Sequence, residues 1–149
     1  MKKFSFPPLQ TPNAHTLILG SMPGEASLDV SQYYAHPRNH FWPFMDSILG
    51  VDYALPYEQR CDALIKLGFA VWDVLRACVR EGSLDSRIQS DSIETNDFRG
   101  FFTDHPGITR VFLNGGKAEQ LYLRKVRPCL LYTSPSPRDL STSRMPSSA

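Results

Sequence analysis

The stretch TLILGSMPG, residues 16–24, decides how the chain folds. Thr16–Leu19 is a short, mostly aliphatic run of the kind that forms a buried strand. The next five residues, GSMPG, hold two glycines that permit a tight turn and a proline that stiffens it, so that successive backbone N–H groups could face a ligand. An ordinary turn from a strand into a helix would have the same composition. A buried strand that ends in a glycine loop is typical of the first unit of an α/β sheet.

Beyond this stretch, helical and strand patterns alternate along the chain. Apolar residues at helical spacing, closed by a glycine, predict one helix over 41–49 and a second over 57–67. The remaining predicted elements are a strand at 69–75, a short helix around 98–102, a strand at 111–113 and a helix from 116 to about 127. This alternation indicates a parallel α/β sheet with helices on both faces.

The composition is that of one soluble domain. The chain has 149 residues, of which 42% are hydrophobic, enough for a single core. No apolar run approaches the roughly 20 residues of a membrane span, and the start lacks the apolar stretch of a signal peptide. The three cysteines include no CxxC pair, so neither a disulfide framework nor a metal cluster is indicated. We therefore expect a cytoplasmic protein without a membrane partner.

The last part of the chain, Cys129–Ala149, has a different character. It runs CLLYTSPSPRDLSTSRMPSSA, rich in serine, threonine and proline, as in a disordered tail. A transposase adapter used in short-read sequencing encodes CLLYTSPSPRD in one frame, and its remainder encodes the final SRMPSSA. We interpret 129–149 as a translated, disordered sequencing artefact and 1–128 as the natural domain, incomplete at its C-terminus. Without Arg138, Arg144 and Asp139, the 16 basic and 15 acidic side chains become 14 of each, so net charge does not indicate a nucleic-acid partner.

Ligands of such sheets bind at the carboxyl ends of the strands, which selects three places in this chain. They are the GSMPG loop, Asp73 near the end of the second predicted strand, and NGGKA at 114–118. Neither loop is a dinucleotide-binding motif or a P-loop, because the glycine spacing differs and Lys117 is followed by alanine. The chain also has no HExxH, GxSxG or CxxC, which argues against metalloprotease, hydrolase-triad and cluster chemistry. A flavodoxin-like nucleotide-binding protein would need a phosphate loop that the sequence does not show.

A second informative segment is YYAHPRNHFWP, residues 33–43. It combines four aromatic side chains with two histidines, an arginine and an asparagine. This composition suits a pocket for a flat ligand, and it equally suits the start of the helix predicted at 41–49 with its apolar residues in the core. Asn39 fits either role, since asparagine is a favoured helix N-cap.

Four motifs taken together resemble the uracil-DNA glycosylase superfamily. They are GSMPG, YYAHPRNHFW, VWDVLRACVREGSLDS and VFLNGGKA, which follow one another over nearly all of residues 12–125. They are most similar to the hypoxanthine-DNA (DNA-deoxyinosine) glycosylase group, and HPxNxFW is also similar to the mismatch-specific uracil/thymine glycosylases. The resemblance implies a three-layer α/β/α fold with a central, mainly parallel four-stranded sheet. Since the tail replaces the end of the domain, we expect the last strand to be missing.

The resemblance also implies an activity, namely monofunctional hydrolysis of the N-glycosidic bond of a deaminated base in DNA. Hypoxanthine is the first expected substrate and uracil the alternative, and we expect a monomer with no cofactor and no metal. Such an enzyme flips the base into a pocket that stacks on its face and binds its edge. A non-catalytic nucleic-acid-binding α/β module is a further alternative. Met22 favours the module, because some branches carry at this position an Asp or Asn that activates water.

The resemblance assigns roles to individual residues. Asn39 is the predicted catalytic residue, since Met22 cannot activate water. The predicted base-binding residues are Gly20, Ser21, Met22, Pro23, Gly24, Tyr34, Phe41 and Asp73. The predicted DNA-binding residues are His36, Arg38, Asn114, Gly115 and Lys117. Asp73 would accept a hydrogen bond from N1–H of hypoxanthine or N3–H of uracil, although Asp73 and Asn114 could instead be helix caps and His36 and Arg38 ordinary surface residues.

Overall fold

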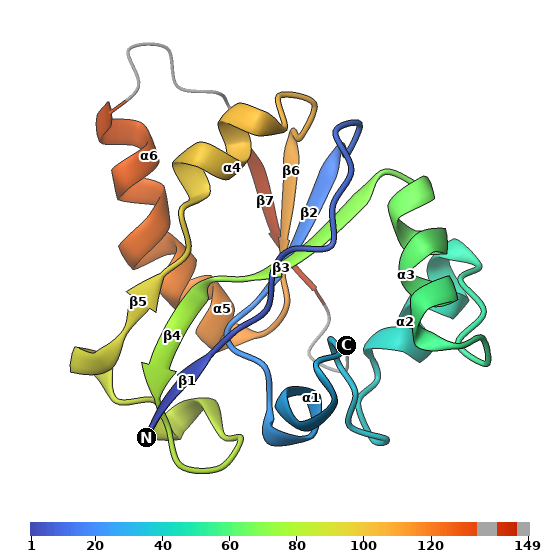
Figure 1. The fold of residues 1–149 in the computed structure, drawn as a ribbon. Helices are drawn as coiled ribbons and strands as arrows, with labels where there is room; N and C mark the ends of the chain where they lie inside the picture. The colour runs from blue at the N-terminus through green and yellow to red at the C-terminus, as the bar shows by residue number, and fades with distance from the viewer. Residues whose placement is uncertain (134–139, 146–149) are drawn as a thin grey trace.

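The structure is a computed structural model that describes residues 1–133 and 140–145. Its centre is a four-stranded parallel sheet with the strand order β3-β2-β6-β7 (Figure 1). The strand predicted from the opening stretch is β2 (Thr16–Gly20), which is buried along its whole length. It pairs with β3 (Phe69–Asp73) on one side and with β6 (Arg110–Leu113) on the other. The predicted α/β sheet is therefore confirmed.

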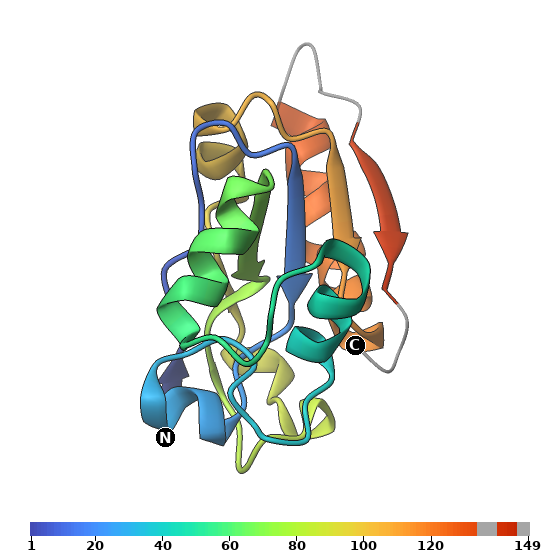
Figure 2. The same ribbon diagram turned by 90° about the vertical axis from the view of Figure 1, so that its right-hand side faces the viewer.

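Helices cover both faces of this sheet (Figures 1 and 2). One face carries α2 (Phe41–Leu49) and α3 (Tyr57–Lys66). The other carries α4 (Phe98–Asp104) and a continuous helical segment made of α5 (Gly116–Leu121), a π-helical turn at Tyr122–Val126 and α6 (Arg127–Thr133). Alternate residues of β2 enter two separate apolar cores, with Ile18 facing α2 and Leu17 and Leu19 facing α4. This alternation follows from the two-residue period of a strand.

A second, antiparallel sheet adjoins the first and was not predicted. It has the order β1-β4-β5, formed by β1 (Lys2–Phe4), β4 (Leu75–Val79) and β5 (Glu94–Thr95). The apolar run 69–75, predicted as one strand, is divided at Val74, where the chain leaves the parallel sheet and enters the antiparallel one. Further short elements that lacked a clear pattern are α1 (Glu25–Val30) and the 3₁₀ turns at Asp85–Arg87 and Ser90–Ser92.

The prediction that the last strand is missing is wrong. Ser141–Arg144 forms β7, which pairs in parallel with β6. Without a neighbour, the edge of β6 would leave its backbone N–H and C=O groups unpaired. The strand that pairs with them uses its own backbone groups, so the tail can form this strand despite its polar sequence. Most β7 side chains accordingly stay exposed. The expected disorder of the tail is therefore also wrong for 129–133, which continue α6, and for 141–144; residues 134–139 and 146–149 lie outside the described part of the chain.

Candidate active site

A cavity of about 350 Å³ lies where β2, β3 and β6 end. Its wall contains nine of the residues predicted for the site, namely Ser21, Met22, Pro23, Gly24, Tyr34, His36, Asn39, Asp73 and Asn114. It also contains residues that were not predicted: Ala26, Ser27, Tyr33, Ser83 and Asp85. The topology thus brings residues from all four quoted motifs to one cavity at the carboxyl edge of the sheet, where α/β folds bind their ligands.

Position 20 requires a glycine because two side chains, those of Asp73 and Tyr34, lie close to its Cα atom. It lies opposite Asp73 in the parallel register of β2 and β3. A Cβ atom at this position would lie 2.6 Å from Asp73 Oδ1 and 3.0 Å from the Tyr34 hydroxyl. These distances are too short for any side chain, so glycine lets the carboxyl and the phenol approach the backbone at the end of β2.

Asp73 lines the cavity and is buried. Only 3% of its surface is exposed, and its Oδ2 atom has no hydrogen-bond partner among the described residues. Burial and the negative charge of Asp85 raise the pKa of the Asp73 carboxyl to about 7, while Arg80 lowers it. The alternative role as a helix cap is wrong, because β4 and not a helix follows. A buried acceptor without a partner is suited to a ligand that brings an N–H group.

Two aromatic rings form a stack beside the cavity. Tyr34 lines the cavity and has a left-handed backbone conformation with φ of 56°. Its ring stacks on Phe41 with the centroids 3.9 Å apart and the planes 19° apart. Phe41 is fully buried behind Tyr34 and does not line the cavity. Burial and the charge of Asp73 raise the pKa of the Tyr34 phenol above its ordinary value, so the ring that could meet a flat ligand carries a neutral hydroxyl.

Asn39 lies at the cavity and contacts the start of α2, although the N-cap residue of that helix is the next one, His40. The Oδ1 atom of Asn39 accepts a hydrogen bond of 2.8 Å from the backbone N–H of Phe41, the first residue of α2. The turn before it is closed by a bond from Asn39 N to His36 O of 2.9 Å. Since Oδ1 is used by the helix start, the amide nitrogen Nδ2 is left as the donor that Asn39 can offer a ligand or water.

The predicted DNA-binding residues are only partly brought together. His36 lines the cavity, and its Nδ1 accepts from Arg38 N at 3.0 Å. Asn114 also lines it, and its backbone N–H bonds to Leu19 O at 2.7 Å. Arg38 is exposed and lies outside the wall. Gly115 and Lys117, in the loop and first turn that start α5, also lie outside it.

The segment after β4 supplies residues that were not predicted. Arg80 is 2% exposed; its guanidinium donates to Gly82 O at 2.8 Å and to Pro23 O at 2.6 Å. Ser21 Oγ donates to Asp85 Oδ1 at 2.7 Å, and Ser83 Oγ accepts from Glu25 N at 2.8 Å. The bonds from Arg80 to Pro23 and from Ser21 to Asp85 join the GSMPG loop to the segment that follows β4. Arg80, Ser83 and Asp85 all lie within the third quoted motif, VWDVLRACVREGSLDS. The motif could therefore have pointed to them, but the spacing of its residues did not indicate which ones reach the site.

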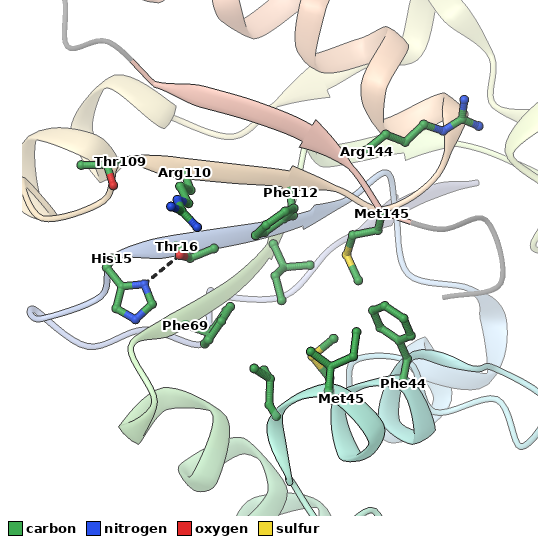
Figure 3. A pocket seen from close by; sticks show the side chains of 13 residues that line it. His15, Thr16, Phe44, Met45, Phe69, Thr109, Arg110, Phe112, Arg144 and Met145 are labelled. Atoms are coloured by element: carbon green, nitrogen blue, oxygen red, sulfur yellow. Dashed lines mark hydrogen bonds between the residues drawn. The ribbon is translucent and has the colours of Figure 1, made fainter.

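A larger cavity of about 530 Å³ lies between α2 and the sheet (Figure 3). Phe44 and Met45 of α2 face Phe69 and Phe112 of the sheet across it. It contains none of the residues predicted for the site and no carboxylate. We therefore assign the candidate site to the smaller, more polar cavity.

Two wider properties of the described residues bear on the site. In residues 1–133 and 140–145, no three His, Cys, Asp or Glu side chains gather in a group that could hold a metal ion. No helix in the same ranges has the length and apolar character needed to cross a bilayer.

Comparisons with known proteins place the chain in a family. It is 40% identical over 119 residues to a hypoxanthine DNA glycosylase of Methanosarcina barkeri, covering 79% of this chain and 74% of the relative. A hypoxanthine DNA glycosylase of Methanosarcina acetivorans is 37% identical with the same coverage. The solution NMR structure of a uracil-DNA glycosylase-like protein of M. acetivorans has a TM-score of 0.78 and 33% identity, covering 100% of this chain and 86% of that one. No protein-family model matches. The chain belongs to the hypoxanthine DNA glycosylase group of the uracil-DNA glycosylase superfamily.

Proposed function

We propose that the protein is a DNA repair glycosylase that hydrolyses the N-glycosidic bond of hypoxanthine in DNA. The observation that carries this proposal is the buried Oδ2 of Asp73, which has no hydrogen-bond partner in residues 1–133 and 140–145 and lies in a cavity that Asn39 and Tyr34 also line. Hypoxanthine presents N1–H on its edge, which a carboxylate accepts. The Tyr34 ring offers a face for the base, and flipping brings the base out of the duplex into the cavity.

Hydrolysis needs water and a stabilised leaving base. The C1′–N9 bond breaks with its electron pair on the base, hydroxyl from water bonds to C1′, and the remaining proton goes to a base nitrogen. Asn39 Nδ2 is the donor that we assign to water or sugar, and we assign backbone N–H groups of the GSMPG loop to stabilise the developing charge of the base. Met22 lines the cavity at the position where some branches carry a water-activating residue, so catalysis here relies on positioning and not on a strong base.

Uracil is the second candidate substrate. Its N3–H is the same kind of donor as N1–H of hypoxanthine, so Asp73 alone accepts either base. The sequence HPxNxFW, which mismatch-specific uracil/thymine glycosylases share, favours this alternative. A module that binds DNA without cleaving it is the third.

Base release from duplex DNA tests these alternatives. The substrates carry one deoxyinosine or one deoxyuridine, and Asn39→Ala is the matched variant. Faster release of hypoxanthine than of uracil, lost in Asn39→Ala with DNA binding retained, is the expected result. Uracil release alone would move the protein to the mismatch-uracil branch. No release of either base, also from folded protein in which residues 1–128 are joined to the natural C-terminus, would favour the non-catalytic module.

Three statements about the whole protein remain proposals. We propose that it is a monomer in the cytoplasm, which light scattering and fractionation of the source cells test. We also propose that 129–149 is not natural sequence, because 129–139 (CLLYTSPSPRD) and 143–149 (SRMPSSA) match a translated sequencing adapter. Sequencing the source gene across codon 128 tests this, and a genomic sequence that encodes CLLYTSPSPRD would contradict it.

A further inference from the structure

Two carboxyl groups with different surroundings line the candidate active site. Asp73 is buried, whereas Asp85 is exposed and bonded to Ser21 Oγ at 2.7 Å. Arg80 lies buried beside them, fixed by the carbonyls of Pro23 and Gly82, and its NH1 atom has no hydrogen-bond partner among the described residues. A positive and a negative charge therefore lie near one buried acid, and both come from the segment that follows β4.

The two charges act on Asp73 in opposite directions. Asp85 disfavours the ionised form of the Asp73 carboxyl, and Arg80 favours it. The other titratable groups that interact with Asp73 or share its cavity are Tyr33, Tyr34 and His36. Burial and the charge of Asp73 raise the pKa of both phenols, so these stay neutral near pH 7. Burial is the largest cause of the raised pKa of Asp73, and the charges of Asp85 and Arg80 modulate it in opposite directions.

The charge of Asp73 decides which base edge it can bind. An ionised carboxylate only accepts hydrogen bonds, so it favours N1–H of hypoxanthine and repels the lone pair on N1 of adenine. A protonated carboxyl has one donor and one acceptor. It can pair with N1–H and O6 of hypoxanthine, and equally with N1 and the N6 amino group of adenine. Only the ionised form therefore distinguishes hypoxanthine from the undamaged base from which it arises.

We propose that Asp85 and Arg80 are specificity-determining residues of the hypoxanthine reaction, which by opposite charge effects on buried Asp73 set the preference for bases with a protonated ring nitrogen. This inference rests on the proposed function. Both residues act through Asp73 and neither is assigned contact with the base. Their hydrogen bonds to the GSMPG loop, at Ser21 and Pro23, add a positioning effect on the same wall.

Three substitutions separate the charge effect from a structural one. Asp85→Asn removes the charge and keeps an oxygen that accepts from Ser21. Arg80→Gln removes the opposing charge, and Arg80→Lys retains it. Glu81→Gln is the matched control, since Glu81 is an exposed carboxylate of the same loop outside the cavity wall.

The first measurement is the titration midpoint of the Asp73 carboxyl carbon by ¹³C NMR in the full chain, assigned with Asp73→Asn. Asp85→Asn should lower the midpoint by about half a pH unit or more, since solvent screens part of an exposed charge. Arg80→Gln should raise it, whereas Arg80→Lys and Glu81→Gln should leave it near that of the parent. If Arg80→Gln does not fold, the comparison of Asp85→Asn with Glu81→Gln still shows whether the charge of Asp85 shifts the midpoint of Asp73.

The second measurement is the ratio of hypoxanthine to adenine release from matched duplexes between pH 5 and pH 9. The ratio should rise with pH in the parent, and at pH 6 it should be about threefold higher in Asp85→Asn, which corresponds to half a pH unit. An unmoved midpoint or ratio in a chain that releases hypoxanthine would overturn this inference alone. A folded parent that releases no base would instead count against the proposed function.

Discussion

The free energy of unfolding of an Asp73→Asn variant should increase relative to that of the parent as the pH rises. The folded state raises the pKa of this carboxyl from 3.8 to about 7, so between these values the folded chain holds a proton that the unfolded chain has lost. Stability then falls as the pH rises through this window, by about 1.4 kcal/mol per pH unit, and the fall levels off near the folded pKa. The asparagine amide does not titrate, so from pH 5 to pH 7 the difference in unfolding free energy between Asp73→Asn and the parent should grow by about 2 kcal/mol.

Urea denaturation of both chains at pH 5, 6, 7 and 8 measures this difference. The unpaired amide in Asp73→Asn adds a constant offset, so only the change with pH is informative. Asp62→Asn is the control, because it removes a carboxylate from the exposed side of α3. A difference that is flat with pH, or that shrinks as the pH rises, would refute the reasoning. If Asp73→Asn is more stable than the parent at pH 7 and releases no hypoxanthine, then the Asp73 carboxyl serves function at a cost in stability.

The remaining predictions concern the catalytic residue, the glycine below Asp73 and the tail. Asn39→Ala should slow single-turnover hypoxanthine release by about 10²–10³-fold, and loss of the bond to Phe41 N should cost about 1 kcal/mol of stability by urea denaturation; a rate within a few-fold of the parent would remove Asn39 from the mechanism. Gly20→Ala should destabilise the chain by about 1–3 kcal/mol, because its Cβ would lie 2.6 Å from Asp73 Oδ1; wild-type stability and activity would show that the carboxyl is free to move. Replacing 129–149 by the resequenced C-terminus should raise both unfolding free energy and base release, and equal values for the two chains would contradict the artefact interpretation.

The parallel sheet and its large helices could be predicted from the sequence because their signals are local. Apolar residues of α2 recur at helical spacing and end at Gly50, and β2 is a continuous buried run. The antiparallel sheet could not be predicted, since β1 is a three-residue strand whose partner β4 lies far along the chain. The break between β3 and β4 at Val74 depends on the pairing of β4 with β1. The apolar run 69–75 is continuous in sequence and therefore does not reveal this break.

The sequence predicted many of the residues that line the candidate site, but not all of them. Residues that follow strands converge on the cavity because parallel strands end at one edge, which explains Ser21, Asp73 and Asn114. Phe41 was predicted in the wall and lies behind Tyr34, because periodicity cannot tell which of two adjacent rings faces the cavity. Arg80 and its burial could not be predicted, since its acceptors are backbone carbonyls.

The antiparallel pairing of β1 with β4 has a consequence for the order of folding. Ser5 bonds to the carbonyl of Arg76 across 71 positions of the chain, and Lys3 reaches the carbonyl of Gly82. During synthesis, residues 3–5 must therefore wait for more than 70 further residues before they find their partners. Contacts between residues so far apart in the chain form late and slowly. The carbonyl of Gly82 accepts hydrogen bonds from both Lys3 and Arg80, so the segment after β4 reaches its final position only once β1 has paired. An N-terminal extension that hinders the pairing of β1 would therefore slow the formation of the candidate site.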